Sequence, residues 1–122
     1  MLLKQQVSCL ECSKKLKELG VKQESLFYWD FCRFTNGDEW IIRVEGYDYS
    51  MPTPIESVSA FTVAELGEIL KQTNCSISSN YISGNEEWLC DMSNWPLSVG
   101  ETEACARAKM LIYLIENKLI VA

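Results

Sequence analysis

The chain has 122 residues and a formal net charge of −6, with eleven basic side chains, seventeen acidic side chains and no histidine. A chain of this length can bury a hydrophobic core of its own, so we expect one domain that covers residues 1–122. The missing histidine excludes the usual general base, the usual zinc ligand and every histidine-containing triad. The acidic excess argues against direct binding to nucleic acid.

Hydropathy argues against a membrane segment or an export signal. The longest purely apolar run, residues 110–115, is far shorter than the roughly 20 residues that a membrane helix needs. The N-terminal stretch MLLKQQVSCLEC reaches charged residues too early for the apolar region of a signal peptide. We therefore expect a cytoplasmic protein without a membrane partner, whose six cysteines are reduced thiols that serve as small hydrophobic side chains.

The first predicted element is a helix over residues 9–19. Ser8 and Glu11 have the spacing of a capping box, and Gly20 can take the left-handed conformation that ends a helix. The apolar stripe of this helix consists of Cys9, Cys12, Leu16 and Leu19. Its spacing indicates one buried face.

Residues 26–46 predict a β-hairpin that turns at Asn36-Gly37, because a tight hairpin turn favours residues that accept positive φ. Counting outward from this turn gives a register that pairs aromatic residues with branched ones. It pairs Arg33 with Trp40, Phe31 with Ile42, Trp29 with Val44 and, on the other face, Cys32 with Ile41 and Asp30 with Arg43. The register thus also matches a carboxylate with a cation.

Residues 46–60 contain two prolines and no sustained period, which predicts a long crossing loop. Three loop residues and one tryptophan further along form the candidate partner-binding group: Tyr47, Tyr49, Met51 and Trp95. We expect Tyr47, Tyr49 and Trp95 to lie near one another at one end of the sheet. Such aromatic residues can anchor a protein interface, line a small-molecule site or plug the open end of a sheet.

The second half of the chain predicts a helix, a hairpin and a longer helix. Thr62 and Glu65 form a capping box for a helix over residues 63–71. Residues 77–92 predict a hairpin that turns at Gly84-Asn85 and pairs Tyr81 with Trp88, Ser79 with Cys90 and Ile77 with Met92. Apolar residues at helical spacing in the stretch 98–120 predict a last helix that starts near residue 99, after a capping box of Ser98 and Glu101.

The predicted order of elements is α-ββ-α-ββ-α. Two antiparallel hairpins in this order indicate an α+β domain with one sheet of about four strands and the helices on one face.

Cys9-x-x-Cys12 is the one chemical motif in the sequence. A redox role requires the motif directly after a strand, at an exposed helix N-terminus. No strand is predicted before it, and both thiols are in line with Leu16 and Leu19, which favours core packing. A zinc site would need two more thiols at finger-like spacing, and the other four cysteines lack that spacing.

The remaining sequence contains no phosphate loop, dinucleotide-binding motif or nucleophile elbow. The acidic residues form no obvious acid–base pair, and the adjacent pairs Asp38-Glu39 and Glu86-Glu87 follow predicted turns, where carboxylates are usually solvated. We therefore assign no catalytic, cofactor-binding or metal-binding residue and expect no cofactor.

Three stretches carry a resemblance to a known group of proteins: KELGVKQESLFYW (17–29), SAFTVAELGEIL (59–70) and ACARAKMLIYLIENKLI (104–120). In these stretches the chain resembles small proteins without an established activity that are carried by phages and prophages of gut bacteria. The stretches are structural segments and not catalytic motifs. The resemblance implies an intracellular accessory protein of a mobile element and assigns no site residue.

These observations favour a non-enzymatic protein that binds a protein partner, either another protein or a second copy of itself. One alternative is an acidic inhibitor that occupies the nucleic-acid site of a host protein, because the chain is strongly negative. Another alternative is a small enzyme that uses carboxylates or thiols. Carboxylates gathered on one face would favour the inhibitor, and a deep pocket with convergent polar groups would favour the enzyme.

Overall fold

The computed structural model describes residues 2–44, 53–73, 75–92 and 95–121. The α-helices of this part are α1 (Leu10–Glu18), α2 (Val63–Leu70) and α3 (Glu103–Glu116), and two short 3-10 helices are η1 (Leu3–Gln5) and η2 (Lys71–Thr73). The strands are β1 (Phe27–Phe34), β2 (Gly37–Val44), β3 (Glu56–Ala60), β4 (Ser78–Ile82), β5 (Glu87–Asp91) and β6 (Ser98–Gly100).

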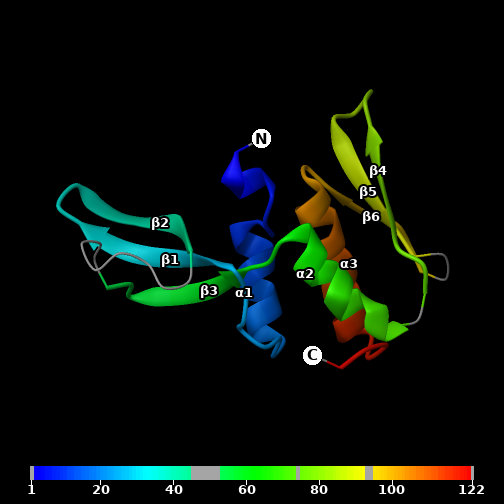
Figure 1. Cartoon of the computed structure of the whole chain (residues 1–122), viewed down its shortest axis with the longest axis horizontal. Helices are drawn as coiled ribbons and strands as arrows, with labels where there is room; N and C mark the ends of the chain where they lie inside the picture. Colours follow the sequence, from blue (N-terminus) through cyan, green and yellow to red (C-terminus); the bar gives the residue numbers. More distant parts are fainter. Residues whose placement is uncertain (1, 45–52, 74, 93–94, 122) are drawn as a thin grey trace.

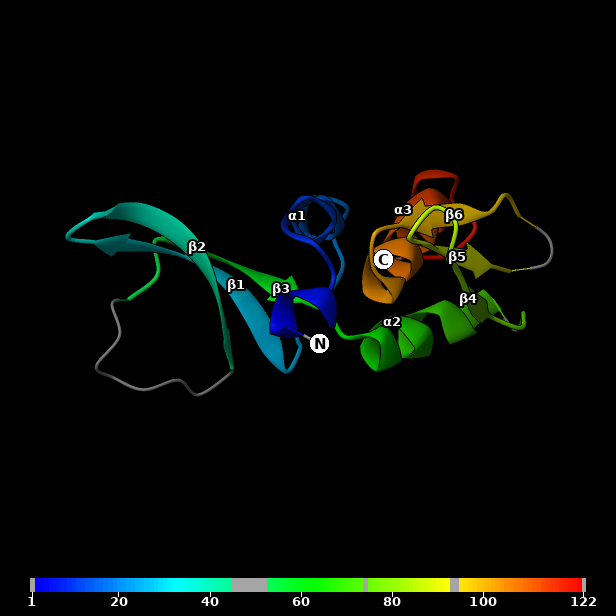
Figure 2. The ribbon, with the colours of Figure 1, turned by 90° about the horizontal axis from the view of Figure 1, so that it is seen from above.

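The strands form two antiparallel sheets of three strands each. The first sheet has the order β2-β1-β3, and the second has the order β4-β5-β6. The sheets lie at opposite ends of the molecule, and the three α-helices lie between them (Figures 1 and 2). The predicted α+β class is confirmed, whereas the prediction of a single sheet is wrong because each hairpin acquires its own third strand.

The segment before α1 is attached to the start of α2. Val7 forms an isolated antiparallel bridge with Thr62, and the Ser8 hydroxyl accepts a hydrogen bond from the backbone N–H of Phe61. Ser8 also exchanges a hydrogen bond with the hydroxyl of Ser13, so it is a buried linking residue rather than the predicted helix cap. The N-cap of α1 is Cys9, and Gly20 ends the helix with φ of +94°, as predicted.

The first hairpin has the predicted faces but not the predicted partners. Its two-residue loop is residues 35–36, and β2 already begins at Gly37, whose φ is +123°. Moving the loop by one position shifts every partner by two residues, so Phe31 lies opposite Trp40 and Asp30 opposite Ile41. A shift of two residues leaves each side chain on the same face of the sheet.

Part of the predicted crossing loop is a strand. Residues 56–60 form β3, which pairs with β1 so that Val58 lies opposite Trp29 and Ala60 opposite Phe27. Val58 and Ala60 are fully buried. This strand was missed because it is short and contains two serines, which weakens the alternation of apolar and polar residues.

The second hairpin has the predicted register, with Tyr81 opposite Trp88 and Ser79 opposite Cys90. The capping box of α2 is confirmed as well, since Thr62 and Glu65 each accept a hydrogen bond from the other's backbone N–H.

The predicted start of the last helix is wrong. Residues 98–100 form β6 instead, and α3 begins at Glu103 after its cap, Thr102, whose hydroxyl accepts from the N–H of Cys105 at 3.1 Å. Gly100 explains how a strand can end directly against the helix. A Cβ at this position would lie 2.6 Å from the backbone nitrogen of Ala106, so only glycine fits.

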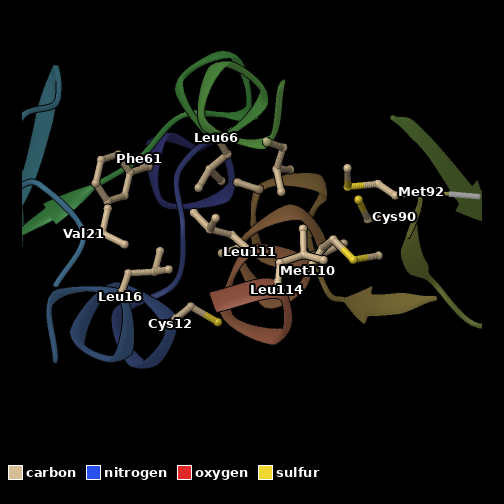
Figure 3. Close-up of a cluster of buried hydrophobic side chains, with 14 of the residues drawn as sticks. Cys12, Leu16, Val21, Phe61, Leu66, Cys90, Met92, Met110, Leu111 and Leu114 are labelled. Atoms are coloured by element: carbon tan, nitrogen blue, oxygen red, sulfur yellow. The ribbon is translucent and has the colours of Figure 1, made fainter. Parts of the chain in front are cut away.

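Helix α3 is the centre of the core. It contacts α1, α2 and all three strands of the second sheet. Leu111, Met110 and Leu114 of this helix are fully buried, and Figure 3 shows their side chains among those from the other elements. The neighbouring buried side chains include Cys12, Leu16, Phe61, Leu66, Cys90 and Met92.

Candidate functional site

The predicted aromatic group is only partly within the described residues. Tyr47, Tyr49 and Met51 lie outside them, so their role in binding stays a prediction. Trp95 is half-buried and packs against the core, and its backbone N–H donates to the carbonyl of Met92 at 2.9 Å. The strands that flank the loop belong to the first sheet, whereas Trp95 lies between β5 and β6 of the second sheet.

The outer face of the second sheet carries an apolar group that the sequence analysis did not single out. Leu89 of β5 lies directly opposite Val99 of β6, on the face that points away from Cys90 and the core. Leu97 precedes β6 by one residue, and the alternation of an extended chain places it on the same face as Val99. Leu97 is 54% exposed and Val99 is 37% exposed, so this group has a wide contact with solvent.

Carboxylates lie on both sides of this apolar group. Glu87 and Asp91 precede and follow Leu89 by two residues on β5, so they point to the same outer face. Both side chains are half-exposed. We call the set Leu89, Leu97, Val99, Glu87 and Asp91 the outer acidic face.

Most of the net negative charge lies in the segment of the sequence that contains this face. Residues 72–106 contain five acidic side chains and no lysine or arginine, whereas the other 87 residues contain eleven basic and twelve acidic side chains. The nearest cation along the chain, Arg107, points the other way. Its Nε donates to the Ser79 hydroxyl at 2.9 Å, and its guanidinium lies 3.7 Å from Glu103.

A cavity of about 380 Å³ lies between the first turns of α2 and α3. It is lined by Gln5, Gln6, Thr62, Val63, Ala64, Trp88, Glu101, Thr102 and Glu103. The positive ends of two helix dipoles and two carboxylates face the same space, so neither sign of charge is clearly favoured there. The lining contains no pair of groups placed as nucleophile and base, and the cavity therefore gives no support to the enzyme alternative.

The cysteines are mostly core residues. Cys12, Cys32, Cys90 and Cys105 are buried, and Cys9 and Cys75 are half-buried. Burial raises the pKa of the Cys90 thiol to about 11. Among the described residues, no three cysteine, aspartate or glutamate side chains are arranged to hold a metal ion.

None of the helices in the described ranges combines the length and apolar character needed to cross a membrane. Comparisons of the chain with protein-family models, with curated proteins and with solved structures gave no match.

Two sequence signals could have indicated the outer acidic face. One is the alternation in EWLCD (87–91), in which one leucine stands between two acidic residues on the side opposite Cys90. The other is the run without any basic residue from 72 to 106. Both depend on the pairing of β5 with β6, which the prediction of a helix over residues 98–100 had hidden.

Proposed function

We propose that the chain is a non-enzymatic binding protein that contacts a protein partner through the outer acidic face. One observation carries this proposal: the exposed Leu97 and Val99 lie beside the half-buried Leu89, which stands between two carboxylates on β5, in a part of the chain that has no cation. Apolar centres with charged rims are typical of protein interfaces. The resemblance to phage and prophage proteins supports an intracellular accessory role in the cytoplasm.

The charges indicate the chemistry of the partner. A complementary surface would offer an apolar depression with lysine or arginine side chains at its rim, opposite Glu87 and Asp91. A second copy of this chain is a poor partner for the same face, because two such faces would bring like charges together. Association should therefore be with a different, basic protein and should weaken as salt is added.

The same charges favour a second candidate function, in which the partner's basic surface is its nucleic-acid site. The run of carboxylates over residues 72–106 would then take the place of phosphates. This is the acidic inhibitor considered from the sequence.

The decisive experiment compares two double variants of exposed residues in affinity capture from an extract of a bacterium that carries such a prophage. The test variant is Leu97→Ser with Val99→Ser, on the outer acidic face. The control variant is Leu26→Ser with Ile55→Ser, at the first sheet, where both side chains are more than half exposed. Thermal melting should be nearly unchanged for both, as expected for surface positions.

We expect the wild type and the control variant to retain the same captured protein and the test variant to lose it. Equal capture by all three proteins would contradict the proposal. The two candidate functions are then separated by adding DNA or RNA to the purified complex. Displacement of the chain by nucleic acid supports the inhibitor, and formation of a ternary complex supports simple binding.

A further inference from the structure

Three of the six thiols meet where the N-terminal ends of two helices approach each other. Cys9 is the N-cap of α1, and Cys12 is the third residue of the same helix. Cys105 is the third residue of α3. Cys9 and Cys12 lie one turn apart at the start of α1, and Cys9 shifts the pKa of both Cys12 and Cys105, so these three thiols form one electrostatic cluster.

The members of this cluster differ in access to solvent. Cys9 is half-buried, whereas Cys12 and Cys105 are 6% and 7% exposed. Cys9 is therefore the thiol that a reagent in solution reaches first. Its position as an N-cap whose side chain makes no capping hydrogen bond leaves the amides of the first helical turn available to a thiolate.

The two possible partners of Cys9 differ in the direction of their pKa shifts. The contact with Cys9 lowers the pKa of Cys12, which favours its thiolate. The contact with Cys9, together with burial, raises the pKa of Cys105 and keeps that thiol protonated. Contact with Cys105 lowers the pKa of Cys9 itself, but the contact with Cys12 and burial outweigh this and leave it raised.

We propose that Cys9 and Cys12 are a redox pair that forms a reversible disulfide by exchange with a small organic disulfide. The N-cap and the third residue of a helix are close enough for a cap side chain to reach the backbone of the third residue. The same closeness suits a disulfide. The pair is thus placed for a bond within one helical turn, which requires no movement of α3.

The exchange proceeds in two balanced steps. The Cys9–Cys12 pair first loses one proton to water, and the resulting charge favours Cys12. The Cys12 thiolate then takes up the Cys9 proton as the more exposed Cys9 sulfur attacks one sulfur atom of the reagent RSSR. The S–S bond of the reagent breaks, a mixed disulfide forms on Cys9, and the leaving thiolate takes up a proton. Cys12 then loses its proton and attacks the Sγ atom of Cys9, which releases the second RSH. Two protein thiols are oxidised to one disulfide, and RSSR is reduced to two RSH.

The experiment uses the reduced, folded full chain and glutathione disulfide as the probe. After oxidation, the sample is quenched with acid, free thiols are alkylated and the protein is digested with trypsin. Cleavage after Lys4 and Lys14 places Cys9 and Cys12 together in peptide 5–14, and Cys105 falls in peptide 72–107. Peptide 23–33 contains the fully buried Cys32 and serves as an internal control.

We expect peptide 5–14 to become lighter by two hydrogen atoms and to lose both alkylation sites, while peptide 23–33 stays fully alkylated. Glutathione should reverse the change. In the Cys12→Ser variant, the glutathione adduct should remain on Cys9, because the resolving thiol is missing. In the Cys105→Ser variant, the loss of both thiols from peptide 5–14 should persist.

Two results would overturn the proposal. One is a native peptide 5–14 that keeps both thiols under conditions that oxidise the urea-unfolded chain. The other is a cross-link between peptides 5–14 and 72–107 in place of the bond within peptide 5–14, which would show that the Cys9–Cys12 pair reacts with one of the cysteines at positions 75, 90 and 105 instead of with itself. Both results come from the wild type, so they hold even if a variant fails to fold.

Discussion

Arg43 Nε donates a hydrogen bond to Asp30 Oδ2 at 2.7 Å, although both side chains are almost completely buried in the first sheet. Ser57 donates to the other oxygen of Asp30. We predict that Asp30→Ala lowers the free energy of unfolding by about 3–5 kcal/mol, because it leaves the buried guanidinium without its carboxylate. Urea denaturation followed by circular dichroism measures this loss.

The control for this prediction is an exposed ion pair in the same hairpin. Arg33 and Asp38 lie 3.5 Å apart, with 75% and 37% of their side chains exposed. Asp38→Ala should cost less than about 1 kcal/mol. Equal losses of unfolding free energy in the two variants would show that burial does not determine how much each ion pair contributes to stability.

Gly100 gives a second prediction, about the junction between β6 and α3. Gly100→Ala should lower the free energy of unfolding by about 1–3 kcal/mol, because the new methyl group would press on the backbone of Ala106, which cannot rotate away. Gly84→Ala is the matched control, since a Cβ at Gly84 meets no atom within 4 Å. A thermal midpoint that is equal in both variants would contradict the close contact at Gly100.

A third prediction concerns the depth of burial along α3. Leu111 is fully buried and Ile115 is only half-buried. Leu111→Ala should therefore cost about 2–5 kcal/mol, the range for core leucines, and Ile115→Ala should cost clearly less. The urea midpoints of the two variants provide the comparison, and the reverse order would mean that the helix presents another face to the core.

A fourth prediction concerns alkaline pH. Burial raises the pKa of Cys90 to about 11 from its ordinary value of 9.0, so the folded chain holds this proton more tightly than the unfolded chain. The resulting stabilisation is fully present below pH 9 and is lost as the pH rises through about 11. The slope between these values is at most about 1.4 kcal/mol per pH unit for this one group.

Urea titrations between neutral pH and pH 11 test this slope. Cys90→Ala should show a smaller loss of stability with pH than the wild type. Cys105 contributes a loss of the same sign, because its pKa is raised as well, so the variant should keep part of the slope. If the wild type and the variant lose stability with the same slope, Cys90 does not contribute to the pH dependence.

Local patterns predicted the elements of this fold better than their ends. The Thr62 capping box and the Tyr81–Trp88 register were correct because the signals for both lie within a few residues. The start of α3 was wrong because Ser98 and Glu101 imitate a capping box. The competing interactions, pairing of Ser98 with Cys90 and the contact of Gly100 with Ala106, involve tertiary contacts that a local pattern cannot reveal.

The candidate site was predictable only in part, for the same reason. The acidic excess was evident from composition, but its location on one sheet required the pairing of Leu89 with Val99. The mutual effect of Cys9 and Cys105 on their pKa values depends on the packing of α1 on α3, which are far apart in the sequence, and spacing alone indicated only Cys12 as a neighbour.

The central place of α3 has a consequence for the order of folding. The β1–β2 hairpin closes over a two-residue loop, so its contacts can form early. The helical core is different, because α1 contacts a helix that begins more than eighty residues later. Closure of such a long segment is slow relative to local contacts. During synthesis, α1 can pack on β3 once residue 60 has been made, but the surfaces of α1 and α2 that pack on α3 stay uncovered until residue 116 has been made.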